Sequence, residues 1–197
     1  MRKFNWRKIK IRPVSADQLD DRMLLINLYV SQALIFVIGL VWILLQHQNI
    51  ISVLAPPSTA EFLLWGFGLA AVVVIVDLTI SRWVPEEAAD DGGVNNKIFR
   101  NRPIWHIVLI CLVVSFCEEL LFRGAIQFAI GPYWTSIVFA AIHVRYLKHW
   151  VPTGLVFCIS YGLGWIYIQT GTLWAPIAAH FAIDLVMGLI IRYRRES

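Results

Sequence analysis

The stretch from Ile104 to Ile130, IWHIVLICLVVSFCEELLFRGAIQFAI, decides the fold class of this chain. It is longer than the ~20 apolar helical residues that cross the ~30 Å hydrocarbon core of a bilayer. Three charged residues nevertheless stand in it: Glu118, Glu119 and Arg123. An ionisable residue at mid-bilayer costs roughly 2.5–3.5 kcal/mol on insertion scales, so such residues usually mark a function. The stretch therefore predicts a membrane helix that carries chemistry.

The composition of the whole chain agrees with a membrane protein. Of its 197 residues, 58% are hydrophobic and 15% are charged, whereas soluble domains average about 45–50% and about 25%. The mean hydropathy is +0.66. These values exclude a water-soluble domain, a disordered chain and a disulfide scaffold. Three cysteines lie inside apolar runs, and we expect them to be small buried hydrophobes rather than bridges: Cys111, Cys117 and Cys158.

Six apolar runs predict six transmembrane helices, and hence an all-α, polytopic membrane helix bundle. A Gly131–Pro132 break separates the third run from the fourth, which is short for a full crossing. The runs are Met23–Leu45, Phe62–Ile80, Ile104–Ile130, Tyr133–Leu147, Val151–Thr170 and Leu173–Ile191.

The basic residues predict how these helices are oriented. Except for Arg123, all of the 17 lysines and arginines precede the first run, follow the sixth, lie in the second connection, or stand at the end of the fourth run and just after it. The positive-inside rule places that side in the cytoplasm. We therefore expect both termini to be cytoplasmic, in a multi-pass protein of the cell membrane. Because the basic residues act as topology signals, we expect no nucleic-acid partner.

The same pattern divides the chain into five segments. Pro85, Gly92 and Gly93 mark a linker between two groups of helices. The segments are a basic cytoplasmic N-terminal segment (1–22), a two-helix transmembrane front (23–80), a cytoplasmic linker (81–103), a four-helix core (104–191) and a basic cytoplasmic tail (192–197).

Three pairs of residues four positions apart stand on the third, fourth and sixth runs, and residues at that spacing share a helix face. Glu118 is turned about 100° from Glu119 around its helix. At ~1.5 Å per residue from the outer helix ends, the ionisable residues fall within about 8 Å in depth. We therefore expect one buried polar site. The pairs are Glu119 and Arg123, Phe139 and His143, and His180 and Asp184.

Two carboxylates beside two histidines can activate water. A buried carboxylate is a usable base near neutral pH, and a histidine can transfer protons or donate to an oxyanion. Arg123 can form a two-pronged pair with Glu119, which leaves Glu118 as the free carboxylate. The nearest serines and cysteines stand in no recognisable nucleophile motif, which disfavours a serine or cysteine mechanism: Ser115, Cys117 and Ser160.

Zinc has three candidate ligands in this set, Glu118, His143 and His180, with a fourth coordination position left open. The metal-binding spacing HExxH is absent. The residues therefore leave the cofactor undetermined between none, zinc and another divalent metal.

Three motifs in the core resemble those of a known family. Their order on successive late helices resembles the CPBP family of CAAX prenyl proteases and bacteriocin-processing enzymes, also called Abi proteins. The resemblance covers roughly residues 104–191. The motifs are Glu118-Glu119-Leu-Leu-Phe-Arg123 for EExxxR, Phe139-Ala-Ala-Ile-His143 for FxxxH, and His180-Phe-Ala-Ile-Asp184 for Hxxx(N/D).

The resemblance implies an intramembrane endopeptidase, often classed as a metalloprotease, that hydrolyses a peptide bond with activated water. The prenyl proteases carry Asn where this chain has Asp184. Because an ionised Asp cannot donate to an oxyanion, we expect Asp184 to orient His180 and leave that ring as the donor. The implied roles are Glu118 as general base, His143 holding and polarising the water, His180 and the residue at 184 stabilising the oxyanion, Glu119 and Arg123 bracing the site, and Phe139 packing beside it.

Two other functions stay open. Members of the family include bacteriocin self-immunity proteins, so a non-catalytic immunity or membrane scaffold protein is one alternative. Such a protein would keep its function when Glu118 is inactivated by substitution. A proton-coupled carrier is the other, although six helices without inverted repeats argue against it. The expected partners are a peptide or membrane-protein substrate and the lipid bilayer, and nothing in the sequence indicates prenylated substrates.

Overall fold

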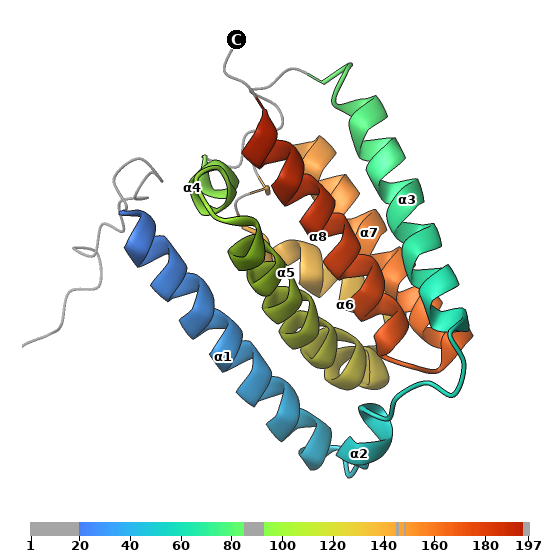
Figure 1. Ribbon diagram of the computed structural model, residues 1–197. Helices are drawn as coiled ribbons and strands as arrows, with labels where there is room; N and C mark the ends of the chain where they lie inside the picture. Colours follow the sequence, from blue (N-terminus) through green and yellow to red (C-terminus); the bar gives the residue numbers. More distant parts are fainter. Residues whose placement is uncertain (1–19, 85–92, 145, 148, 195–197) are drawn as a thin grey trace, which may run out of the picture.

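The computed structural model describes residues 20–84, 93–144, 146–147 and 149–194, and its regular secondary structure there is helical, as predicted (Figure 1). Most of the N-terminal segment, part of the linker, the end of the tail, Arg145 and Lys148 lie outside the described residues. The helices are α1 (Asp21–Leu45), α2 (Ile50–Val53), α3 (Glu61–Ile80), α4 (Val94–Phe99), α5 (Ile104–Glu119), the π-helix η4 (Leu120–Ile126), α6 (Gln127–Ile142), α7 (Trp150–Thr170) and α8 (Trp174–Tyr193).

Five helical stretches of the described residues are long and apolar enough to cross a membrane. Four of them are α1, α3, α7 and α8, and the fifth is Ile104–Ile142, which joins α5, η4 and α6. Large apolar side chains such as Leu34, Leu64 and Ile168 point outward from these helices. Apolar side chains on the outside are stable in lipid and costly in water. The predicted polytopic helix bundle is confirmed.

The long stretch Ile104–Ile142 reverses at the predicted break. Gly131 has φ 77° and ψ 169°, which a residue with a Cβ adopts rarely, and Pro132 follows it. The chain then runs back along η4, so that the Phe139 ring packs edge-on against Phe122 with centroids 4.7 Å apart. The two runs that the sequence separates are therefore two limbs of a hairpin.

The second limb of this hairpin is shorter than the run Tyr133–Leu147 predicts. α6 ends at Ile142, and the described residues that follow form turns up to α7. From Pro132 to Ile142 a helix rises about 16 Å, which is roughly half of the hydrocarbon core. The predicted end at Leu147 is wrong, and this limb has about half the length of a full crossing.

The centre of the bundle is the junction of α5 and η4. Every residue from Cys117 to Gln127 is buried. α1 and α6 pack against η4, and α8 packs against α5 (Figure 1). A helix that is buried on all sides lies in the core of its protein. The charged motif that the sequence singles out is therefore shielded from both lipid and water.

The two front helices pack directly on this core. On α3, a Cβ added at Gly66 would lie 2.9 Å from the Ala175 carbonyl oxygen and 3.0 Å from Ala178 Cβ, so the α3 and α8 backbones touch. Small residues allow such close approach between membrane helices. Gly68, two residues further on, has no such neighbour within 4 Å.

The turn after α1 reaches over to η4. Gln46 Nε2 donates to the Ala125 carbonyl oxygen at 3.1 Å, and Gln48 Nε2 donates to that of Gly124 at 3.0 Å. His47 between them has φ 56°, an uncommon value for a residue other than glycine. The strained turn therefore presents two amides to carbonyls of the π-helix.

The three cysteines are free, and the prediction that all are buried is wrong for one of them. Cys111 and Cys117 are buried on α5, whereas Cys158 is exposed on α7. An apolar run places a cysteine inside a membrane helix without fixing which face of the helix it occupies.

Candidate active site

The two charges of the first motif form a buried ion pair. Arg123 Nη1 donates to Glu119 Oε1 at 3.1 Å, and Arg123 Nε lies 3.1 Å from Glu119 Oε2. Neither side chain has any exposed surface. Two approaches between guanidinium and carboxylate fix the orientation of both groups. Arg123, the one basic residue outside the topology pattern, is thus neutralised by its neighbour one turn away.

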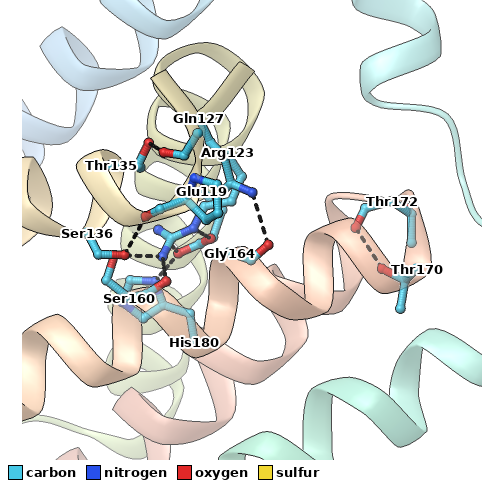
Figure 2. Close-up of polar contacts among 12 residues, drawn as sticks. Glu119, Arg123, Gln127, Thr135, Ser136, Ser160, Gly164, Thr170, Thr172 and His180 are labelled. Atoms are coloured by element: carbon cyan, nitrogen blue, oxygen red, sulfur yellow. Dashed lines mark hydrogen bonds and ion pairs between the residues drawn. The ribbon is translucent and has the colours of Figure 1, made fainter. Parts of the chain in front are cut away.

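Arg123 also fastens η4 to α7. Its Nη2 donates to the Ser160 carbonyl oxygen at 2.8 Å and to Ser160 Oγ at 3.0 Å. Figure 2 shows the guanidinium between Glu119 and Ser160. The Phe139 ring lies on a further side, 5.2 Å from Arg123 Cζ. The guanidinium is therefore held by groups from three segments of the bundle.

His180 brings the third motif to the first. Its Nδ1 lies 2.8 Å from Glu119 Oε1, although the two residues are far apart in the chain. Its Nε2 lies 3.5 Å from Asp184 Oδ2 on the same helix, which is at the limit of hydrogen-bond length. A ring flanked by two carboxylates is suited to carrying an N–H on both nitrogens. The Asp184 side chain is 30% exposed, so this end of the site is the more open one.

His143 lies at the end of α6, and the helix end fixes the tautomer of its ring. The Phe139 carbonyl lacks its usual helical partner because the His143 N–H bonds to Ala140 instead. His143 Nδ1 takes that place, 2.7 Å from the Phe139 oxygen. A carbonyl only accepts, so Nδ1 carries the proton and Nε2 of the neutral ring is left as an acceptor.

Phe139 connects the two histidines. Its ring stacks on His143 with centroids 4.5 Å apart and meets His180 edge-on at 6.3 Å. Phe139 itself is buried. The FxxxH motif therefore places His143 on one side of a fixed aromatic ring and His180 on another.

Glu118 points away from the ion pair beside it, as its position on the helix predicts. It is buried, and its Oε1 accepts a hydrogen bond from Gln32 Nε2 of α1 at 3.2 Å. It is adjacent to Glu119 in the last turn of α5, where both residues are buried. Glu118 is therefore part of the same cluster but, unlike Glu119, is not bonded to a cation in the described part of the chain.

The predicted zinc ligands are not assembled. Among the described residues, no three side chains of His, Cys, Asp or Glu gather closely enough to hold a metal ion. The Nδ1 of His180 is bonded to Glu119, and its Nε2 faces Asp184. The donor set of the described residues does not fit a metal in this arrangement.

Two polar partners in this site were not predicted as such. Gln32 stands in the run Met23–Leu45. A side-chain amide in so apolar a run is itself a signal, but Gln32 is not ionisable and so is not among the candidate residues. Ser160 stands in the sequence only as a weak candidate nucleophile, whereas here it accepts hydrogen bonds from Arg123. Both roles depend on which helices face each other. The spacing of residues along one helix does not reveal this.

Comparison with known proteins places this chain in a family. Residues 100–186 match the family described as "Type II CAAX prenyl endopeptidase Rce1-like". The chain is 43% identical over 129 residues to a protein of Bacillus subtilis (strain 168) described as "Uncharacterized protein YpbD", a match that covers 66% of this chain and 68% of that protein. No solved structure gives a significant match. The chain belongs to this CAAX protease family, which confirms the resemblance found in the motifs.

Proposed function

We propose that this protein is an intramembrane endopeptidase that hydrolyses a peptide bond with water activated by Glu118. The observation that carries the proposal is the bond between His180 of α8 and Glu119, at 2.8 Å, in the buried centre of a membrane bundle. This bond joins two motifs within a family of endopeptidases. A buried polar cluster in a membrane protein usually has a function because it is costly to build.

In the proposed reaction Glu118 is the general base. It takes a proton from water while the water oxygen bonds to the carbonyl carbon of the scissile peptide. The C–N bond then breaks, and the proton held by Glu118 passes to the departing amine. Glu118 suits this role because its bonded partner, Gln32, is a neutral amide that leaves its negative charge in place.

The two histidines serve the water and the developing negative charge. His143 Nε2 is free to accept a hydrogen from the attacking water, since Nδ1 is committed to the Phe139 carbonyl. His180 Nε2 lies 3.5 Å from Asp184 Oδ2, at the limit of hydrogen-bond length, so its N–H is available to the oxyanion. Asp184 then orients the ring, in line with its carboxylate being an acceptor only.

Glu119, Arg123 and Phe139 brace these groups. The ion pair with Ser160 behind it fixes Glu119, and Glu119 in turn fixes His180. Phe139 sets the spacing of the two histidine rings. The substrate that we propose is a peptide or membrane-anchored protein that enters from the cell membrane.

Removing the base tests the proposal. Wild type, Glu118→Gln and a deletion strain would be compared in the native host for their membrane and secreted peptides. We expect defined cleavage products in wild type and none in Glu118→Gln. Glu61→Gln, which removes an exposed carboxylate at the start of α3, is the matched control and should keep the products.

The opposite result has a definite meaning. If Glu118→Gln yields the same peptides as wild type while the deletion has a phenotype, the protein does not act as a protease. A non-catalytic immunity or scaffold function would then replace the proposal.

A further inference from the structure

The first helix contributes a side chain to the site, although it lies outside the residues that match the family. Four residues of α1 are buried: Leu24, Gln32, Gly39 and Ile43. Their spacing of eight, seven and four positions places them on one stripe of the helix that faces the bundle. Gln32 is the polar member of that stripe, and it lies against Glu118.

Within the described part of the chain, Glu118 receives its hydrogen bond from Gln32. Gln32 Nε2 donates to Glu118 Oε1 at 3.2 Å. Held by this oxygen, the carboxylate has Oε2 left to accept a proton. A neutral amide fixes the direction of a carboxylate without cancelling its charge, whereas Arg123 and His180 hold Glu119 as a bound counter-ion.

Gln32 is poorly suited to a purely stabilising role. Its second polar atom, Oε1, is buried and has no hydrogen-bond partner among the described residues. A buried polar atom without a partner destabilises a fold, and a methionine would fill nearly the same space without that cost. The effect of Gln32 on Glu118 explains its presence better than packing does.

We infer that Gln32 is a positioning residue for catalysis: its amide holds Glu118 in the direction from which the carboxylate takes the proton of the attacking water. The inference rests on the proposed protease function. It makes α1 part of the reacting unit, since the base on α5 is aimed by a side chain from another helix.

The test uses Gln32→Met and Gln32→Asn in the full-length protein, purified in lipid nanodiscs. The probe is a quenched fluorescent peptide built on the cut site that the peptide comparison above identifies. We expect Gln32→Met to lower kcat about 10- to 100-fold, the size of effect that a misdirected catalytic group gives. KM should stay unchanged, because the inferred role of the amide is to direct the base and not to bind the substrate. Gln32→Asn keeps the amide on a shorter side chain, and its kcat should lie between those of wild type and Gln32→Met.

Stability separates this role from a structural one. Gln32→Met removes the unpartnered Oε1 but also leaves Glu118 Oε1 without its donor, and because these two effects oppose each other its unfolding temperature should stay near that of wild type while kcat falls. Gln127→Met is the matched control, since Gln127 is also a buried glutamine with a bonded Nε2 and an unpartnered Oε1, but its bond goes to the Gly164 carbonyl. This control should keep the wild-type kcat.

Two results would overturn the inference in different ways. If wild type cleaves the peptide and folded Gln32→Met does so with the same kcat, Gln32 does not position the base and the protease proposal stands. If wild type shows no cleavage that is lost in Glu118→Gln, the protease proposal fails and this inference fails with it.

Discussion

Arg123 carries a charge in a place with no exposed surface, and its environment explains how the fold tolerates it. Glu119 supplies the opposite charge at 3.1 Å, and Ser160 supplies two further acceptors. A buried charge that loses its partner is much more costly than a pair that is removed together. The pair is therefore a unit, and each member is stable only with the other.

This dependence predicts an unequal cost of single and double substitutions. Arg123→Met should lower the free energy of unfolding by about 3–5 kcal/mol, because it leaves the Glu119 carboxylate with one partner fewer. The double variant Glu119→Gln with Arg123→Met should unfold at a higher temperature than Arg123→Met alone. Thermal unfolding in detergent micelles, followed by tryptophan fluorescence, measures both.

The control for this pair is Arg22→Met, which makes the same substitution at an exposed arginine of α1. It should change the free energy of unfolding by no more than about 0.5 kcal/mol. Equal unfolding temperatures for Arg123→Met and the double variant would show that the ion pair is not a unit.

At the scale of the elements, small residues and side-chain amides set how the helices meet. α3 touches α8 through Gly66, and the turn after α1 caps carbonyls of η4 through Gln46 and Gln48. A π-helix turns more widely than an α-helix and is often found at functional sites. The two glutamine amides hold the widened segment that follows the two glutamates.

The contact between α3 and α8 predicts opposite effects of one substitution at two neighbouring positions. Gly66→Ala places a Cβ 2.9 Å from a backbone oxygen of α8, so the two helices must separate and the protein should unfold at a lower temperature. Gly68→Ala meets nothing within 4 Å and should be neutral or stabilising by up to about 1 kcal/mol, since alanine favours helix over glycine. Equal shifts in the two variants would contradict the packing described for Gly66.

At the scale of the whole molecule, the basic residues predict an orientation that cysteine labelling can measure. Ser58→Cys, between α2 and α3, should react with a membrane-impermeant maleimide in intact cells. Ser81→Cys, at the other end of α3, should react only after the cells are permeabilised. Wild type serves as the background for the native cysteines, and labelling of Ser81→Cys in intact cells would reverse the predicted orientation.

Much of this architecture follows from the sequence, and the rest fails for identifiable reasons. The Gly131–Pro132 break is predicted because neither residue continues a helix easily, and the Glu119–Arg123 pair because four positions make one turn. The end of α6 at Ile142 is not predicted, since the apolar run continues and a bond from the His143 ring replaces the helical one. Gln32 is not predicted because its partner is on another helix.

The shortness of α6 after the Gly131–Pro132 break has a consequence for how water reaches the site. The proposed hydrolysis consumes water, and lipid tails around a bundle hold almost none. Backbone that is not helical at membrane depth is tolerated only inside protein or beside water, and the turns that follow His143 are such backbone. In the proposed protease we therefore expect water to reach His143 along these turns, and turnover to depend on the thickness of the membrane in which the protein sits.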